Sequence, residues 1–350
     1  MTLASHSDTL ISIKSAIAKI ADGMDLTGKE AETVMMAIMQ GQATDAQIAA
    51  LLMGWHMKGE TVDEITGAVQ AMRALAHRIP LADSTIVDTC GTGGDRSHTF
   101  NISTAAAFVI AGADITVAKH GNRSVSSRSG SADVLAALGV NIHLSPERVA
   151  ACIQEVGIGF LFAPLYHQAM KACAKPRTEI GIRTMMNILG PLSNPANASI
   201  QILGVYDRSL TDKLAQVLVR LGIQHCFVLH GADGLDEITL TNRTHVSEGK
   251  AGRVWSYDID PEDFGLTRVH PKELVGGTAQ ENAAIISEIF RGQRGPKRDV
   301  VLMNAAPAFI ACGQAKTLRE AYEQAEHVID SGAAYEKLEK LIAFTNAASS

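Results

Sequence analysis

A glycine-rich segment is the strongest chemical signal in the chain. It occupies residues 88–95 and reads Asp-Thr-Cys-Gly-Thr-Gly-Gly-Asp, after a short apolar run and before a helix start near Ser103. Glycine lets the backbone turn tightly and approach a ligand, and a helix N-terminus offers free N–H groups and a positive dipole end. The pattern indicates a site for a phosphorylated ligand. The alternative is a glycine-rich turn with a simple helix cap at Ser103 or Thr104.

Two common nucleotide-binding motifs do not fit this segment. A dinucleotide-binding fingerprint needs its third glycine at position 96, where the chain has Arg96. A Walker loop ends in Gly-Lys followed by Ser or Thr, and that ending is missing. The glycine loop therefore belongs to neither type.

A second polar segment covers residues 119–127 and reads Lys-His-Gly-Asn-Arg-Ser-Val-Ser-Ser. It follows another apolar run, and the Ser-Gly-Ser-Ala-Asp of residues 129–133 begins a helix after it. Two cations, an amide and several hydroxyls around one glycine suit the binding of charged oxygens. A solvated basic loop is the alternative.

A third feature centres on Arg177, whose planar guanidinium suits a carboxylate. A surface ion pair is the alternative for any single arginine. Further along, Gly190 and Pro191, followed by Pro195, predict a stiff turn that acts as a hinge or lines a pocket.

A fourth feature is the adjacent carboxylates Asp236 and Glu237, which follow an apolar run ending near His230. Magnesium favours one or two carboxylates together with water and ligand phosphates. The pair is therefore a candidate metal site, and an ordinary acidic turn is the alternative.

The elements that must position these residues fall into two groups. Residues 1–80 predict helices only, because apolar side chains recur at helical spacing. Three capping boxes precede such stripes, in which a threonine accepts a helix N–H and a later side chain reaches back: Thr27 with Glu30, Thr44 with Gln47, and Thr61 with Glu64. We expect an α-helical domain over residues 1–80.

After residue 80, short apolar runs alternate with helical stretches. Strands are predicted at residues 85–89, 115–118, 159–163, 200–206 and 226–230, with antiparallel additions from 242–268. Helices are predicted to begin near Ser103, Ala132, Pro146, Leu165, Ser209, Thr278, Asp299 and Leu318. The alternation predicts an α/β domain over residues 81–350, with a central mixed, largely parallel sheet and surrounding helices. One continuous domain is the alternative to this division.

Composition excludes several classes of protein. With 350 residues, 46% hydrophobic and 19% charged, the chain resembles a globular protein of two domains or one large one. A net charge of -6 argues against a nucleic-acid-binding surface. Five cysteines without a C-x-x-C pair predict reduced thiols in a cytoplasmic protein. No signal peptide and no apolar run of about 20 residues are found, so we expect neither export nor membrane insertion.

In this order, the motifs resemble those of the anthranilate phosphoribosyltransferase family, in the class of nucleoside phosphorylases and phosphoribosyltransferases with a glycine-rich loop. The resemblance extends to about residue 310 and rests on residues 91–95, 101–104, 119–123, 177, 187–191 and 236–237. It implies transfer of the phosphoribosyl group of 5-phosphoribosyl 1-pyrophosphate (PRPP) to the amino group of anthranilate, in tryptophan biosynthesis. It also implies Mg2+, a homodimer, and a helical domain joined to an α/β domain with the active site between them. The helical domain over residues 1–80 would serve dimerisation and form part of the substrate channel, with the 165–197 segment packing on it.

The resemblance assigns roles residue by residue. PRPP would be bound by Gly91, Gly94, Asp95, Thr99, Asn101, Ser103, Thr104, Lys119, Asn122, Arg123, Ser126, Ser127 and Ser131. Anthranilate would be contacted by Gly91, Asn122, Arg177, His120, His167 and Pro191, and the metal by Ser103, Asp236 and Glu237. Since the substrate amine is a neutral nucleophile at pH 7, no dedicated acid or base is expected, and positioning and leaving-group electrostatics should dominate.

One position departs from the family pattern. Arg96 stands where the family usually has a small residue, which changes the loop's flexibility or adds a cation near the pyrophosphate. Two other functional hypotheses are alternatives to anthranilate phosphoribosyl transfer: a pyrimidine nucleoside phosphorylase-like enzyme and a non-catalytic, nucleic-acid-binding relative. Asn122 with Arg177 favours an aromatic carboxylate over a nucleoside, and the acidic charge disfavours nucleic acid.

Overall fold

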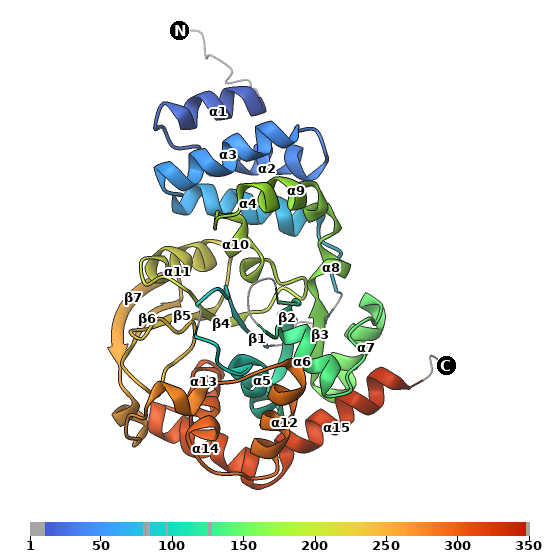
Figure 1. Ribbon diagram of the computed structural model, residues 1–350, viewed down its shortest axis with the longest axis vertical. Helices are drawn as coiled ribbons and strands as arrows, with labels where there is room; N and C mark the ends of the chain where they lie inside the picture. Colours follow the sequence, from blue (N-terminus) through green and yellow to red (C-terminus); the bar gives the residue numbers. More distant parts are fainter. Residues whose placement is uncertain (1–10, 80, 82–84, 96, 125–127, 348–350) are drawn as a thin grey trace. The chain divides into compact units, whose positions relative to one another are not determined.

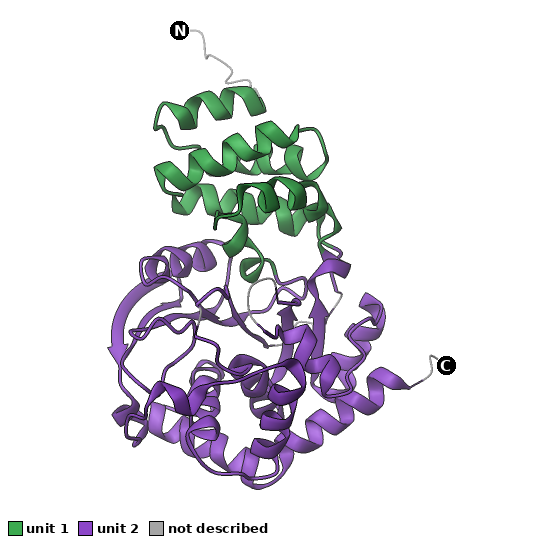
Figure 2. Ribbon diagram, viewed as in Figure 1, with its two compact units in different colours: residues 1–76, 167–193 green, residues 77–166, 194–350 purple. Residues whose placement is uncertain are grey.

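The computed structural model describes residues 11–79, 81, 85–95, 97–124 and 128–347. Arg96, Ser126 and Ser127, which the sequence marked as candidate site residues or departures from the family pattern, lie outside the described residues. The chain divides into two compact units, shown in Figure 2. Unit 1 comprises Met1–Ala76 and His167–Ser193, and unit 2 comprises His77–Tyr166 and Asn194–Ser350.

Unit 1 is built from helices alone within its described residues. Its first four helices are α1 (Ile13–Ala21), α2 (Gly28–Met39), α3 (Asp45–Lys58) and α4 (Val62–Leu75). All three predicted capping boxes are confirmed: in each, the threonine accepts from the third helical N–H while the Glu or Gln accepts from the threonine N–H. The N-termini of α2, α3 and α4 are thus defined by local sequence.

The second segment of unit 1 packs on these helices. It contains η1 (Gln168–Cys173), α9 (Ala174–Ile180), α10 (Met186–Leu189) and η2 (Pro191–Ser193). The 3-10 helix η1 contacts α2, α9 contacts α3, and α10 and η2 contact α4. Arg73 of α4 donates two hydrogen bonds to the Leu192 carbonyl, at 3.0 and 2.7 Å. A stretch distant in sequence is therefore fastened to the helical bundle.

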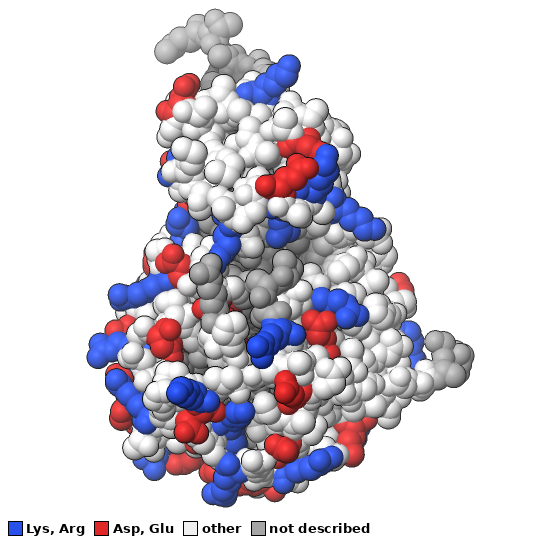
Figure 3. Space-filling view, viewed as in Figure 1, with Lys and Arg blue, Asp and Glu red and all other residues white. Residues whose placement is uncertain are grey.

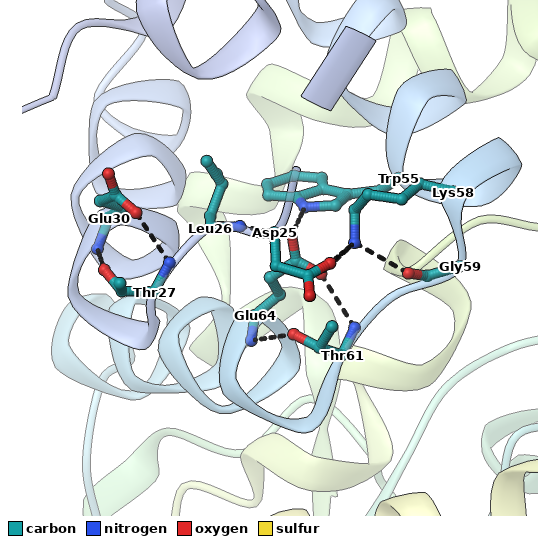
Figure 4. A network of polar contacts seen from close by, with 9 residues as sticks. All are labelled: Asp25, Leu26, Thr27, Glu30, Trp55, Lys58, Gly59, Thr61 and Glu64. Atoms are coloured by element: carbon teal, nitrogen blue, oxygen red, sulfur yellow. Dashed lines mark hydrogen bonds and ion pairs between the residues drawn. The ribbon is translucent and has the colours of Figure 1, made fainter. Parts of the chain in front are cut away.

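A buried carboxylate organises the centre of unit 1 (Figure 4). Glu64 is fully buried, and its Oε1 accepts from the Leu26 N–H at 2.9 Å and the Trp55 indole N–H at 3.0 Å. Its Oε2 accepts from Lys58 and from the Thr61 N–H, both at 2.9 Å. Burial lowers the pKa of Lys58, but its hydrogen bonds to acidic partners outweigh burial and raise that pKa above its ordinary value. One side chain thus joins α3, α4 and the loop before α2.

Unit 2 contains a seven-stranded sheet in the order β3-β2-β1-β4-β5-β6-β7. The strands are β1 (Ile86–Gly91), β2 (Thr116–Gly121), β3 (Ile158–Phe162), β4 (Ile200–Gly204), β5 (His225–Gly231), β6 (Thr244–Lys250) and β7 (Arg253–Ile259). The first five are parallel, whereas β6 and β7 are antiparallel. The mixed, largely parallel sheet expected from the sequence is confirmed. The strand order reverses between β1 and β4, which lie side by side.

Helices cover both faces of this sheet (Figure 1). Those that contact strands are α5 (Ile102–Gly112), α7 (Pro146–Val156), α8 (Ala163–Tyr166), α11 (Leu210–Arg220), α13 (Pro296–Ala311) and α15 (Ala333–Asn346). The remaining helices of unit 2 are α6 (Ser131–Ala137), η3 (Pro261–Phe264), η4 (Pro271–Leu274), α12 (Ala279–Phe290) and α14 (Leu318–Asp330). Val87 and Val117 belong to the apolar core that includes α5 and α13, whereas Ile86 and Ala118 belong to the cluster that includes α7. Alternate residues of one strand therefore face two buried layers, as in parallel sheets generally.

Four details differ from the sequence expectations. The helix predicted from Leu165 is divided into α8, η1 and α9, because His167 has non-helical dihedral angles. Helix α13 begins at Pro296 rather than Asp299, since Gly295 at φ 128° ends the preceding turn and proline suits the first helical position. Gly190 adopts helical angles and leads from α10 into η2, so the predicted turn forms later, around Pro195, where the Asn197 N–H donates to the Asn194 carbonyl at 3.1 Å. Helix α15 was not predicted.

The surface and the cysteines complete the description. Among the helices of the described residues, none is long and apolar enough to span a membrane. All five cysteines lie in the described part and are free thiols. On the face of unit 2 seen in Figure 3, acidic and basic side chains alternate without forming one continuous basic field.

Candidate functional site

The candidate site lies where the strand order reverses, at the carboxyl ends of β1 and β4. Gly91 and Gly204 are the paired last residues of these two strands. A Cβ atom at Gly91 would lie 2.7 Å from Asp236 Oδ2, and one at Gly204 would lie 1.5 Å from the Asp236 main-chain oxygen. Only glycine permits so close an approach, so the acidic segment lies directly on the two strand ends. Open α/β sheets bind ligands at this kind of position.

Two main-chain hydrogen bonds tie the acidic pair to the neighbouring segments. The Gly93 N–H donates to Asp236 Oδ2 at 2.8 Å, and the Ser103 N–H donates to Glu237 Oε1 at 3.1 Å. Gly93 and Gly94 have φ angles of 64° and 81°, a conformation that favours glycine. The glycine loop, the start of α5 and the acidic pair are thus brought together, as the sequence analysis expected of its first and fourth motifs.

Asp236 and Glu237 are partly buried carboxyl groups that lie close together, an environment that favours a bound cation. Burial and the nearby charge of Asp95 raise the pKa of Asp236 to about 7. Burial and the charge of Asp236 raise the pKa of Glu237 to about 8. In the described part of the chain, no three Asp, Glu, His or Cys side chains are grouped as a metal site on their own. A cation here would therefore need further ligands, which for magnesium are commonly phosphate oxygens and water.

Asn304 holds the residue that follows the acidic pair. Its Oδ1 accepts from the Ile238 N–H at 2.8 Å, and its Nδ2 donates to the Ile238 carbonyl at 2.8 Å. The side chain is buried within α13, 2% exposed. A residue far along the chain therefore fixes the main chain next to Glu237. The sequence analysis missed Asn304, because an asparagine inside a helix carries no recognisable motif.

Lys119 is a buried cation between the end of β1 and the start of α5. It lies in β2, and its ammonium donates to the Thr89 carbonyl and lies 3.5 Å from Ser103 Oγ. Burial lowers the pKa of Lys119, and the charge of Asp88 is the largest influence in the opposite direction. Burial also raises the pKa of Asp88 to about 6, while its Oδ1 accepts from the His120 N–H at 3.1 Å. His120 itself is buried at the end of β2.

The second polar segment is organised by Asp133 in the first turn of α6. Its carboxylate accepts from the N–H groups of Ser124 and Gly130, and pairs with Arg123 at 3.0 Å. Burial raises the pKa of Asp133, but these hydrogen bonds outweigh it and lower the pKa below its ordinary value. Arg123 remains half exposed, and its guanidinium lies over the Phe162 ring, 5.9 Å from the centroid. The predicted residues Asn122 and Ser131 are linked by a 3.3 Å hydrogen bond.

Four further predicted residues lie in the segment before α5 or in the first turn of that helix. Asp95 accepts from the Ser97 hydroxyl, and Thr99 forms an isolated bridge with Val275. Asn101 is joined by hydrogen bonds to Ser129 and to Asn282, a residue that the sequence analysis also missed. Thr104 is buried within α5, 1% exposed, so its hydroxyl lies away from solvent.

Three predicted residues belong to unit 1 rather than unit 2. Arg177 lies in α9, partly buried, and burial lowers the pKa of its guanidinium. His167 is buried beside the start of η1, and burial lowers its pKa to about 4, so its ring is neutral at pH 7. Pro191 is the first residue of η2. These three are the residues expected to contact anthranilate from the second segment of unit 1.

Comparison with known proteins gives consistent matches. Residues 83–335 match the glycosyl transferase family, a/b domain, and residues 14–76 match the helical bundle domain of the same family. The anthranilate phosphoribosyltransferase of Symbiobacterium thermophilum is 53% identical over 334 residues, covering 95% of this chain and 98% of that protein.

Solved structures agree with these matches. The crystal structure of anthranilate phosphoribosyltransferase from Thermus thermophilus is similar with a TM-score of 0.90 and 41% identity, covering 95% of this chain and 99% of that one. The Saccharomyces cerevisiae enzyme in complex with PRPP and Mg has a TM-score of 0.87 and 26% identity, covering 95% and 97%.

Proposed function

The chain belongs to the anthranilate phosphoribosyltransferase family, and from this premise we propose that the segments meeting at the ends of β1 and β4 bind its PRPP. It transfers the phosphoribosyl group of PRPP to the amino group of anthranilate, giving N-(5-phosphoribosyl)anthranilate and pyrophosphate in tryptophan biosynthesis. The observation that carries the site proposal is the pair of hydrogen bonds from Gly93 to Asp236 and from Ser103 to Glu237. These hydrogen bonds hold the glycine loop, the start of α5 and the acidic pair together at the ends of β1 and β4, where the strand order reverses.

PRPP is anionic, so its site must supply donors and positive charge. The described residues proposed for it are Gly91, Gly94, Asp95, Thr99, Asn101, Ser103, Thr104, Lys119, Asn122, Arg123 and Ser131. Ser126 and Ser127, outside the described residues, complete the proposal. The glycine loop and the first turn of α5, where the side chain of Thr104 is buried, would contribute main-chain N–H groups. Lys119 and Arg123 would contribute charge, each held in place by a hydrogen bond or ion pair.

Mg2+ fits the residues proposed for it, which are Ser103, Asp236 and Glu237. Burial, and after it the charge of a neighbouring carboxylate, raises the pKa of both carboxyl groups, and a divalent cation would compensate their negative charge. The yeast relative was solved in complex with PRPP and Mg, which supports a role for magnesium in this family. Bound magnesium supplies positive charge that stabilises the departing pyrophosphate. The carboxylates would hold that ion, while Ser103 and Gly93 fix the carboxylates through their N–H groups.

Anthranilate would be bound by Gly91, Asn122 and Arg177, with His120, His167 and Pro191 beside it. The planar guanidinium of Arg177 can donate two parallel hydrogen bonds to the substrate carboxylate. No dedicated general acid or base is proposed. His167, with a pKa near 4, is too weak a base to serve at pH 7. The attacking aromatic amine is already neutral, so orientation and leaving-group stabilisation would account for the rate.

The location of the enzyme and its partners are proposed alongside the site. We place the enzyme in the cytoplasm as a homodimer that binds neither nucleic acid nor membrane. Met24, Met57 and Ile182 of unit 1 are exposed apolar side chains, which would lose contact with water if unit 1 formed the subunit contact. The net charge of -6 disfavours nucleic acid. Sedimentation of the purified chain tests the dimer, and a monomer at assay concentration would contradict it.

The decisive experiment follows the fluorescence of anthranilate as it is consumed. We expect consumption that requires both PRPP and magnesium. The same chain given thymidine or uridine with inorganic phosphate should release no base. Phosphorolysis without anthranilate turnover would reject the proposal in favour of a nucleoside phosphorylase.

A further inference from the structure

A series of side-chain amide hydrogen bonds runs through unit 2 from the start of α12 to the loop before α6. The Gly277 N–H donates to Asn282 Oδ1 at 2.7 Å, and Asn282 Nδ2 donates to Asn101 Oδ1 at 3.0 Å. Asn101 Nδ2 in turn donates to the Ser129 carbonyl at 3.1 Å. The series therefore links three segments that are remote in sequence.

The direction of this series is fixed by its two ends. Gly277 contributes a main-chain N–H, which only donates, and Ser129 contributes a main-chain carbonyl, which only accepts. Asn282 must therefore present its oxygen to Gly277 and its NH2 group to Asn101. Asn101 must present its oxygen to Asn282 and its NH2 group to Ser129. Asn282 is 1% exposed, so water cannot replace a lost partner.

Asn101 is used in an unusual way for its position. It is the N-cap residue of α5, where an asparagine side chain normally accepts from the second or third helical N–H. Here the side chain makes no cap hydrogen bond. It spans from α12 to Ser129 instead, whose hydroxyl also donates to its oxygen at 3.2 Å. The usual local role has given way to a link between segments.

The segment before α12 also runs against the segment before α5. The Gly276 N–H donates to the His98 carbonyl at 2.9 Å, and Thr99 bridges to Val275. A Cβ atom at Gly276 would lie 2.5 Å from the Phe100 nitrogen, so the two backbones are in close contact. Asn282 thus connects this backbone contact to the second polar segment, because it forms a hydrogen bond with Asn101, which in turn forms one with Ser129.

From this geometry we propose that Asn282 is a positioning residue that sets the spacing between residues 99–104 and residues 129–131. The inference rests on the proposed function, because both segments are assigned there to PRPP. A ligand that touches both segments binds well only when their spacing fits. Asn282 would act through Asn101 and not by touching substrate, so its loss should weaken PRPP far more than anthranilate.

The test measures KM for each substrate, kcat and Tm with the full chain at saturating magnesium. Asn282→Asp keeps the acceptor for Gly277 and nearly the same volume, but it turns an oxygen toward Asn101 Oδ1. Asn282→Ala removes both hydrogen bonds. Either change should raise KM for PRPP about tenfold, the effect of losing one or two buried hydrogen bonds, and alter KM for anthranilate less than about twofold.

A double-mutant cycle and a matched control separate positioning from general stability. If Asn282 acts through Asn101, Asn282→Ala should add less than about twofold to KM for PRPP when Asn101→Ala is already present. Thr345→Val is the control, because buried Thr345 of α15 accepts from the Asn141 N–H at 3.2 Å, in a segment without proposed site residues. It should lower Tm without raising KM for PRPP.

Several results would overturn the inference. These are an unchanged KM for PRPP in both variants, multiplicative effects in the double variant, an equal KM change in Thr345→Val, or failure of both single variants to fold by circular dichroism. A wild-type chain that does not consume anthranilate would refute the proposed function itself. An active wild type with insensitive Asn282 variants would refute the positioning role alone.

Discussion

Replacing Gly204 by alanine tests whether the acidic pair must rest on the ends of β1 and β4. The new Cβ atom would lie 1.5 Å from the Asp236 main-chain oxygen and 2.5 Å from its carbonyl carbon. Ordinary contact begins at 3.4 Å, so the Asp236 carbonyl would have to retreat from 1.5 Å to at least that distance. Backbone atoms cannot rotate away as a flexible side chain can. The acidic segment must therefore move away from the glycine loop.

The size of that movement sets the expected loss. Metal–ligand distances tolerate only about 0.2 Å of error, and a misplacement of about 1 Å near a reacting group costs on the order of 100-fold in rate. We therefore expect Gly204→Ala to reduce kcat/KM for PRPP by at least about 100-fold. We also expect half-maximal activity to need more magnesium. Overpacking should lower the free energy of unfolding by about 1–3 kcal/mol, which leaves the protein folded at assay temperature.

The assay is a magnesium titration of anthranilate consumption at fixed PRPP. Gly249→Ala is the matched control, since its Cβ would lie 2.6 Å from Cys226 Sγ and 2.8 Å from a methyl carbon of Val219. It crowds α11 against β6, at the end of β5 remote from Gly231. The control should lose stability but keep the wild-type magnesium response. If Gly204→Ala also keeps that response, the acidic pair is not positioned by the strand ends and the reasoning is wrong.

Three further predictions concern the carboxylates. Converting Asp236 and Glu237 together to Asn and Gln should reduce magnesium-dependent turnover by more than the roughly 10- to 100-fold typical of lost supporting residues; an unchanged magnesium response would exclude them as ligands. Because their folded-state pKa values, about 7 and about 8, lie above the ordinary 3.8 and 4.5, the folded protein binds more protons than the unfolded chain between about pH 4 and 8. The free energy of unfolding of the magnesium-free protein should thus fall as pH rises through this window. Urea unfolding at pH 5, 6, 7 and 8 measures this change, with the variant that carries both substitutions (D236N/E237Q) as the control for other titrating groups. The prediction is wrong if the free energy of unfolding of the wild type, relative to that of the double variant, rises with pH. Glu64→Gln should lower the free energy of unfolding by about 3 kcal/mol or more, since it turns an amide NH2 toward buried donors including Lys58. Glu30→Gln, at a more exposed capping box, should cost under about 1 kcal/mol, and equal losses in the two variants would refute the claim that Glu64 organises unit 1.

Features determined by neighbouring residues could be predicted from the sequence. The capping boxes at Thr27, Thr44 and Thr61 depend on two side chains three residues apart, and all three form as expected. The parallel strands were found because buried runs alternate with helical stretches. The glycine loop before α5 was found because glycine and a helix start are both local signals. Such features need no knowledge of the strand order.

Boundaries were less predictable where one helix follows another closely. Helix α15 was missed although its buried residues, Ala334, Leu338 and Leu341, recur at helical spacing. Only Ser331 and Gly332, the latter at φ 81°, separate it from the end of α14. Because apolar residues recur at helical spacing in both helices, the sequence pattern does not distinguish two helices from one long helix. The left-handed glycine was the available signal for the break.

The residues that sequence reasoning missed, Gly204, Asn282 and Asn304, share a physical property: each acts on the position of another group. Nothing in the sequence shows that Gly204 is needed, because the close approach of Asp236 becomes visible only once β4 is paired with β1 and the Asp236 segment lies on both strand ends. Asn304 and Asn282 lie inside helices that would form without an asparagine, and each forms a hydrogen bond with a residue more than sixty positions away. A buried amide with two complementary faces can specify one relative position of two segments, because either face left unpaired is costly. Such residues should therefore be sought among buried asparagines whose partners lie in segments that already carry binding motifs.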